Sequence, residues 1–547
     1  MAHYTVPARR VLDLYLESTV DYVRPVSQAE LEATFTSPSG TSLRVPGFAS
    51  RSGWHVRFAG SEVGEYSFTT SCTDESNAGL HGVSGTVKVT ARAGPTGNPL
   101  YDHGRVRVHE SRAYFCHEDG TPYFWLADDW WHGTSKRLDW PEGFRELLAD
   151  RTQKGFSMIN MAIGLACDVS KEQLPGANEA GLPWGDDYEE INPDWFDMAD
   201  LRVTAIAEAG LVPGIFFSWG YWIMLLNEER IRRHVRYCVA RWGAYPVVYS
   251  LCGELMMPMY DTPPEEREEE LAEQQRRWIN IARYLRTIDG YGTPVSAHPF
   301  GQAEQATAAI PDRSLIDYNM LQGGHGDVRV SLWSLARTER ILDDPGALRP
   351  IVMGETCFEG MFNRTSPFGQ RLLFWGQFLN GLRGICYGAE GIWQMNTREE
   401  PLGPSPHGQA WSYIPWREAM HFGGSLHMGI GKKMLERFEW WRFERHREWV
   451  EIPERAGSAT ESYAASAGIP REIRVIYFGQ YARMMPPKIL GLEPNVTYAA
   501  RWFDPITGRW MPYTDIESIP VEPDHDGTWV VPCPPVMQDW VLVLEAR

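Results

Sequence analysis

Two segments of the chain each run from apolar residues into a glutamate: Pro246-Val-Val-Tyr-Ser-Leu-Cys-Gly-Glu254 and Pro350-Ile-Val-Met-Gly-Glu355. Buried parallel strands read as nearly continuous apolar runs, and the residues that follow them project from the carboxyl end of the sheet. Two carboxyl groups brought together there can split an acetal, because one protonates the leaving oxygen and the other attacks or activates water. We assign Glu254 the acid/base role and Glu355 the nucleophile role. The alternative for either glutamate is a helix cap or an ion pair.

Other candidate residues follow other predicted strands. Asp128 and Asp129 end the first, so that one Asp would accept sugar hydroxyls while Trp130 or Trp131 forms a platform for the ring; a helix N-cap is the alternative. The remaining candidates for substrate binding are Trp219, His298, Gln322, His325, Glu359 and Trp393. Glu359 competes with Glu355 as nucleophile, but Glu355 ends the apolar run. Each of these side chains taken alone could be structural.

Apolar strand-like runs alternate with amphipathic helical segments over residues 110–445, which predicts a parallel α/β fold. The eight predicted strands are Tyr123 to Ala127, Ser157 to Ile163, Leu211 to Phe217, Pro246 to Leu251, Pro294 to Ala297, Leu315 to Met320, Pro350 to Gly354 and Gly384 to Tyr387. Eight strands close a (β/α)8 TIM barrel. A doubly wound open sheet is disfavoured, because no Gly-x-Gly-x-x-Gly or P-loop follows the first strand.

Short runs of alternating apolar and polar residues, separated by Gly, Ser and Pro, flank this region. They predict antiparallel β-sandwich domains at residues 1–95 and 446–547.

Composition limits the partners. The net charge of -19 argues against nucleic acid and membrane surfaces, which need basic footprints. The eight cysteines are scattered, and no His-x-x-x-His pair occurs, so we expect no metal and no cofactor. The first residues have no apolar leader segment, which predicts a cytoplasmic protein. The oligomeric state stays open, a homo-oligomer included.

Three motifs of the middle region resemble the apiosidase-like glycoside hydrolases. The family's Phe-Trp-Leu-Gly-Asp-Thr-x-Trp is similar to Phe124-Trp-Leu-Ala-Asp-Asp-Trp-Trp131, its Glu-x-x-Tyr-Glu-Gly to Glu355-Thr-Cys-Phe-Glu-Gly360, and its Tyr-Gly-x-x-Gly-Ile-Trp to Tyr387-Gly-Ala-Glu-Gly-Ile-Trp393. Residues 8–90 resemble the β-sandwich that precedes such barrels, and the C-terminal region resembles a small β domain often labelled collagen-binding.

The resemblance implies a barrel glycosidase acting on a carbohydrate. Two departures qualify it. The family often has Asp after Gly-Gly on the fourth strand, where this chain has Cys252-Gly-Glu254, so apiose itself is not implied. Related retaining barrels place Asn before the acid/base to hold the sugar 2-hydroxyl, and Gly253 cannot do so.

The sequence therefore predicts a glycoside hydrolase, retaining and exo-acting, that removes a terminal sugar, with furanosides among the candidates. The rival hypothesis is a carbohydrate-binding or adhesion protein with an inactive barrel. It is disfavoured because both strand-end glutamates are present.

Overall fold

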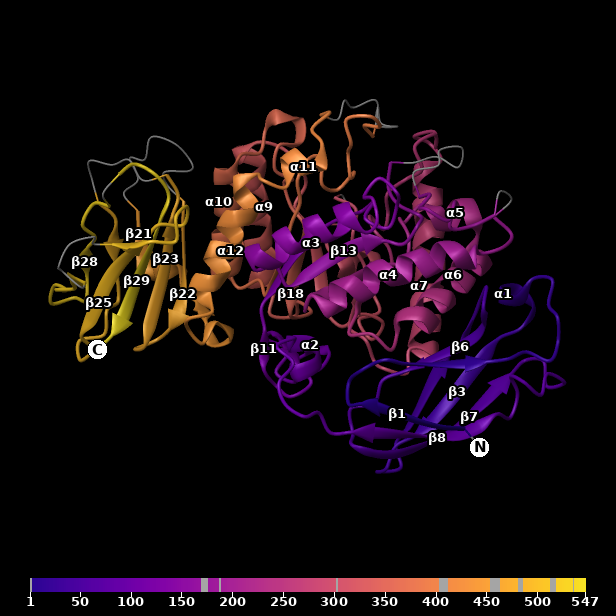
Figure 1. Cartoon of the computed structure of the whole chain (residues 1–547). Helices are drawn as coiled ribbons and strands as arrows, with labels where there is room; N and C mark the ends of the chain where they lie inside the picture. The colour runs from indigo at the N-terminus through magenta and orange to yellow at the C-terminus, as the bar shows by residue number, and fades with distance from the viewer. Residues whose placement is uncertain are drawn as a thin grey trace.

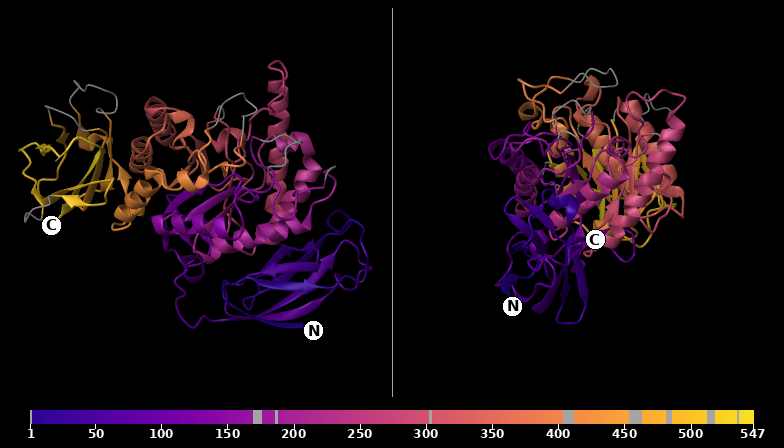
Figure 2. Two further views of the ribbon diagram at one scale, coloured as in Figure 1. Left: turned by 45° about the horizontal axis from the view of Figure 1, so that its top comes forward. Right: turned by 90° about the vertical axis from the view of Figure 1, so that its right-hand side faces the viewer.

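A computed structural model describes residues 2–168, 176–185, 188–301, 304–402, 412–452, 463–480, 486–511, 518–534 and 536–547. An N-terminal β domain lies against one side of a central α/β barrel, and a C-terminal β domain lies against another (Figures 1 and 2). The predicted fold class is confirmed.

The central sheet has eight parallel strands in the order β16-β15-β14-β13-β12-β19-β18-β17, so chain neighbours are spatial neighbours around the barrel. Their bounds are β12 Trp125–Asp129, β13 Met158–Ala162, β14 Val212–Phe216, β15 Val248–Ser250, β16 Val295–Ser296, β17 Asn319–Gln322, β18 Ile351–Glu355 and β19 Gly384–Tyr387. The seam between β16 and β17 is bridged where Asp317 N–H donates to the carbonyl of Val295 at 2.8 Å. Every strand residue is buried, which explains the continuous apolar runs.

One strand starts later than the sequence predicts. The apolar run of the sixth strand begins at Leu315, but β17 begins at Asn319. Leu315 and Ile316 are buried in the turn before the strand, so their apolar character reflects burial without strand pairing. As a result Gln322 is the last residue of β17 and not a loop residue.

The longer helices cover the outside of the barrel (Figure 1). They are α3 Glu142–Lys154, α4 Pro193–Glu208, α6 Glu228–Trp242, α7 Arg267–Ile288, α9 Val328–Asp343 and α10 Pro367–Asn380, followed by α12 Gly423–Leu435. Shorter helices, α5 Trp222–Leu226, α8 Ala306–Ala309 and α11 Trp416–Ala419, lie in the segments between strands and after β19.

The N-terminal domain packs two mainly antiparallel sheets face to face. One has the order β1-β8-β7-β3-β4 and the other β2-β6-β5, with β1 alone pairing in parallel, to β8. The strands are β1 Ala2–Pro7, β2 Leu12–Leu16, β3 Leu31–Thr36, β4 Ser42–Pro46, β5 Phe48–Ser50, β6 Gly53–Phe58, β7 Gly64–Cys72 and β8 Ser84–Thr90. Helix α2 (Pro99–Asp102) and the small sheet of β9 Val106–Val108, β10 Phe115–His117 and β11 Pro122–Tyr123 lead into the barrel.

The C-terminal domain has a larger sheet in the order β20-β22-β23-β29-β25-β26, with β27 added to β25, and a smaller sheet β21-β24-β28. The larger sheet contains β20 Glu444–Arg445, β22 Ala464–Ile469, β23 Ile473–Phe478, β25 Tyr498–Phe503, β26 Trp510–Met511, β27 Ile519–Pro520 and β29 Trp540–Ala546; the smaller contains β21 Val450–Glu451, β24 Lys488–Ile489 and β28 Trp529–Val530. Because β20 already pairs with β22, this sheet begins slightly before the predicted boundary at 446.

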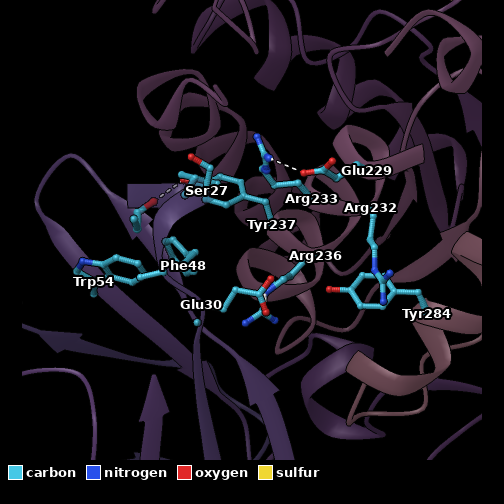
Figure 3. A pocket seen from close by; sticks show the side chains of 14 residues that line it. Ser27, Glu30, Phe48, Trp54, Glu229, Arg232, Arg233, Arg236, Tyr237 and Tyr284 are labelled. Carbon is cyan, nitrogen blue, oxygen red and sulfur yellow. Dashed lines mark hydrogen bonds and ion pairs between the residues drawn. The ribbon is translucent and has the colours of Figure 1, made fainter. Parts of the chain in front are cut away.

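A buried charge network joins the N-terminal domain to the barrel. Arg57 of β6 and Arg241 of α6 both bond the carboxylate of Asp200 in α4, at 2.6 and 2.8 Å. Burial would raise the pKa of Asp200, but the two guanidinium groups lower it below its usual value. A cavity of about 170 Å³ lies in the same interface, lined by Glu30 and by Arg232, Arg233 and Arg236 of α6 (Figure 3). Its arginines face nearby glutamates and Tyr284, and it contains no candidate site residue.

A second buried ion pair joins the C-terminal domain to the barrel. Arg371 of α10 donates from Nε and Nη2 to the two carboxylate oxygens of Asp539, at 2.8 and 2.6 Å. Asp539 is only 1% exposed and immediately precedes β29. The indole of Trp375 stacks beside Tyr477 of β23 in the same interface. This domain is therefore packed onto the barrel as part of one structure.

We expect Arg371→Ala to cost about 3–5 kcal/mol of stability, because it leaves the buried carboxylate of Asp539 without its partner. Calorimetric melting measures the effect. The control is Arg329→Ala, whose exposed pair with Asp327 should contribute less than about 1 kcal/mol. Equal melting temperatures for the two variants would contradict the structural role of the buried pair.

Candidate active site

The two strand-end glutamates meet at the carboxyl end of the barrel. The side-chain nitrogen Nε2 of Gln322 donates to Oε1 of Glu254 at 2.7 Å and to Oε1 of Glu355 at 2.8 Å. The sum of these two bond lengths, about 5.5 Å, is an upper bound on the distance between the two oxygens. Gln322 thus holds the two carboxyl groups close together.

Both glutamates line a pocket of about 420 Å³, a volume within the range of small-molecule sites. Its wall is largely aromatic and apolar. The lining residues are Trp131, Cys167, Asp168, Trp219, Glu254, Met257, Tyr260, Phe300, His325, Glu355, Phe358, Met361, Phe362 and Trp393. Three of them, Asp168, Glu254 and Phe362, have positive φ angles of 53°, 36° and 54°. Such strained conformations typically occur at functional sites.

Gly253 is required by the packing of Trp219. A Cβ atom at position 253 would lie 2.2 Å from Cε3 of that indole. The indole occupies the space beside the acid/base, and its Nε1 donates to Oε2 of Glu254 at 3.2 Å. Trp219 therefore holds Glu254 directly and leaves no room for a side chain at position 253.

The surroundings of the two glutamates drive their pKa values apart. Burial, together with the charge of Glu355, raises the pKa of Glu254 to about 8, although Gln322 and Trp219 oppose the rise. Burial would also raise the pKa of Glu355, but hydrogen bonds from His325 and Gln322 lower it below its usual value. Near neutral pH the pair holds one proton, on Glu254. This is the state in which one carboxyl is an acid and the other a nucleophile.

Backbone N–H groups fix the tautomers of both histidines. The N–H of Glu254 donates to Nδ1 of His298 at 3.3 Å, and the N–H of Phe358 donates to Nδ1 of His325 at 3.4 Å. Each Nε2 therefore carries a proton. His325 donates it to Oε1 of Glu355 at 2.8 Å, whereas Nε2 of His298 lies 3.6 Å from Oε2 of Glu355, beyond hydrogen-bonding distance.

The aspartates of β12 point to opposite sides, because successive strand residues alternate. Asp128 points outward, where Trp130 Nε1 and Arg151 Nε donate to its carboxylate at 2.7 and 2.6 Å. Asp129 points inward and accepts from Asn160 at 2.8 Å, and burial raises its pKa well above the usual value. Neither Asp lines the pocket.

Some of the remaining candidates line the pocket and others lie outside it. Trp131, Trp219 and Trp393 line the pocket, while Trp130 packs on Phe144. Glu359 lies outside the pocket, where it accepts bonds from Tyr387 and from the backbone N–H of Gly424 at the start of α12. Glu355 is thus the pocket carboxylate and Glu359 a structural anchor.

Two acidic residues near the pocket were not predicted from the sequence. Asp168 lines the pocket and bonds Tyr260, and burial raises its pKa to about 6. Glu390 is fully buried and interacts electrostatically with His325, and burial raises its pKa to about 7. Asp168 lies after the second apolar run, beyond Gly164-Leu-Ala-Cys167, so it does not directly follow a predicted strand end. Glu390 lies within Tyr387–Trp393, which was quoted above for its family motif alone.

Among the described residues, no group of three or more His, Cys, Asp or Glu side chains could hold a metal ion. No helix in the described part of the chain is long and apolar enough to cross a membrane.

A parallel eight-stranded barrel whose fourth and seventh strands lead to two adjacent carboxyl groups is the architecture of a glycoside hydrolase. Residues 109–442 match the apiosidase-like, catalytic domain family, and the chain belongs to that family. Residues 5–73 match a domain of unknown function, DUF5060. No curated protein matches the chain in sequence comparison.

Solved structures share the fold. A glycoside hydrolase family 5 protein from Bacteroides vulgatus ATCC 8482 is similar with a TM-score of 0.63 at 19% identity, covering 82% of this chain and 93% of its own. A second protein from that organism, a candidate glycoside hydrolase, has a TM-score of 0.69 at 15% identity and covers 100% of both chains. The three-domain arrangement therefore recurs.

Stability should depend on pH through Glu254. Its pKa is raised in the folded state, so between about pH 4.5 and 8 the folded protein binds more protons than the unfolded chain, and stability falls as pH rises through this window. Glu254→Gln cannot ionise, so its melting temperature relative to wild type should increase from pH 5 to pH 8. Calorimetry at both pH values measures this, with Glu265→Gln at an exposed position as control. Parallel curves for wild type and Glu254→Gln would contradict the buried-proton assignment.

Proposed function

We propose that the protein is a retaining, exo-acting glycosidase in which Glu355 is the nucleophile and Glu254 the acid/base. The observation that carries this is the single amide of Gln322 shared by both carboxyl groups, which limits their nearest oxygens to about 5.5 Å. Retaining enzymes hold their carboxyl groups about 5–5.5 Å apart, whereas inverting enzymes need roughly 6.5–9.5 Å to admit a water.

In the first step, the ionised Glu355 attacks the anomeric carbon. The bond from that carbon to the glycosidic oxygen breaks, and the leaving oxygen takes the proton of Glu254. In the second step, Glu254 removes a proton from water, which attacks the same carbon and releases Glu355. The hydrogen bond from His325 stabilises the Glu355 carboxylate before attack and after release.

His298 is the donor placed to replace the missing Asn. Its side chain is fully buried, its Nε2 proton has no hydrogen-bond partner among the described residues, and that nitrogen lies 3.6 Å from the nucleophile. His298 is not among the residues that line the pocket, so a sugar hydroxyl next to the anomeric carbon would accept this bond after a small shift of the side chains beside Glu355. Bonds to the 2-hydroxyl strengthen in the transition state, so this contact favours catalysis over simple binding.

The pocket shape supports exo action. Aromatic residues from loops after several strands, Trp131, Trp219, Phe300, Phe358 and Trp393, enclose the carboxyl pair and would surround one terminal sugar. Because the chain belongs to the apiosidase-like family, furanosides are the first substrates to test, beside pyranosides.

Substitution of each glutamate should give a different kinetic signature. Glu355→Gln should abolish turnover of all aryl glycosides while the fold persists. Glu254→Gln should lower kcat by about 10²–10⁴ for poor leaving groups and far less for activated phenolates, which depart without a proton. Equal losses across leaving groups would show that Glu254 is not the acid. NMR of the first-formed product should show retained anomeric configuration.

The pH profile of kcat/KM should be bell-shaped. Ionisation of Glu355 sets an acidic limb below pH 4.5, and loss of the proton from Glu254 sets a basic limb near pH 8. Trp219→Phe removes a bond that lowers the pKa of Glu254, so its basic limb should move to higher pH. Trp333→Phe, at an exposed position on α9, is the control and should leave the profile unchanged.

A further inference from the structure

Asp168 adds a third carboxyl group to the pocket, and the two-step chemistry above does not use it. It lines the same pocket as Glu254 and Glu355. Tyr260 holds it in two ways: the phenol O–H donates to Oδ1 at 3.1 Å, and the phenol oxygen accepts the N–H of Asp168 at 3.0 Å. This clamp fixes Asp168, whose backbone φ angle of 53° is unusual for a residue other than glycine.

The clamp leaves the carboxylate able to accept further bonds. No hydrogen bond to Oδ2 of Asp168 is observed from the described residues. A carboxylate accepts bonds at both oxygens, and two neighbouring sugar hydroxyls can donate to it together. The pocket therefore contains one fixed hydrogen-bond acceptor that takes no part in the proton transfers of the proposed reaction.

Positive side chains are missing from the described pocket wall. It contains three carboxyl groups and one imidazole, and no Lys or Arg. Two buried arginines of the barrel have other partners: Arg151 bonds Asp128, and Arg337 bonds the carbonyl of Gln322. His298 behind the wall is kept neutral, since burial lowers its pKa. A carboxylate on a bound sugar would be buried beside like charges without a cationic partner, which is costly.

We propose that Asp168, clamped by Tyr260, binds hydroxyl groups of the terminal sugar and restricts the pocket to sugars that carry no carboxylate. Neutral glycosides bind, and the corresponding uronides are rejected. This inference rests on the proposed function, since it concerns the sugar subsite of the same pocket.

Electrostatic coupling gives Asp168 a second signature. The charge of Asp168 raises the pKa of Glu254, and the charge of Glu355 raises the pKa of Asp168. Asp168→Asn keeps the size and one acceptor oxygen but removes the charge. It should raise KM for the substrate more than it lowers kcat, and it should move the basic limb of the pH profile to lower pH. A residue that only filled space would leave that limb in place.

Binding of matched methyl glycosides to the full-length protein tests the proposal without requiring turnover. Titration calorimetry at pH 7 compares a glucoside with its glucuronide and a galactoside with its galacturonide, with a xyloside and an arabinofuranoside as further neutral probes. We expect at least one neutral probe to bind, more tightly than either uronide by about tenfold or more. Asp168→Asn should weaken neutral binding by a similar factor and reduce the discrimination, while Asp261→Asn, an exposed neighbour of Tyr260, should change neither.

A uronide that binds as well as its neutral partner would overturn the proposal, as would unchanged neutral binding by Asp168→Asn or no binding of any probe. Neutral binding that depends on Asp168, without hydrolysis of any glycoside, would refute only the proposed catalysis.

Discussion

Two like-charged groups held within about 5.5 Å of each other cannot both ionise cheaply in a buried pocket, and the site is organised around that constraint. At an effective dielectric constant of about 20, two unit charges at this distance repel by about 3 kcal/mol. The protein resolves the conflict asymmetrically. Both carboxyl groups accept a hydrogen bond from Gln322. The second donor to Glu355 is His325 at 2.8 Å, whereas the second donor to Glu254 is the indole of Trp219 at the longer distance of 3.2 Å.

The barrel supplies this asymmetry because each strand delivers a different type of side chain. β17 ends in the amide donor Gln322, β18 in Glu355, and the segment after β16 brings His298. Backbone N–H groups then orient the histidines, so the same chain segments that place the carboxyl groups also fix which nitrogen donates. The described residues of the flanking β domains contribute nothing to the pocket wall. Their buried pairs, Arg57 with Asp200 and Arg371 with Asp539, instead attach them to the outer helices of the barrel.

Much of this arrangement was predictable from the sequence, for a physical reason. Strands buried on both faces must be apolar throughout, so all eight were visible and Glu254 and Glu355 stood out where the runs end. The direction of Asp128 and Asp129 was not predictable, because it depends on strand register and on Arg151, which lies a helix away. Asp168 was missed because its strained loop conformation and its bond to Tyr260 join segments distant in the sequence.

The contact between Gly253 and the indole of Trp219 also bears on how the site could have diverged. A Cβ atom at position 253 would lie 2.2 Å from the indole, so no side chain fits there while the indole is present. Removing the indole alone leaves a void beside Glu254, and adding a side chain alone creates a clash. Either change alone disturbs the packing beside Glu254, whereas a paired exchange could make room for a side chain at position 253. The two positions are therefore coupled, and a library that varies position 253 alone should record it as intolerant of every side chain.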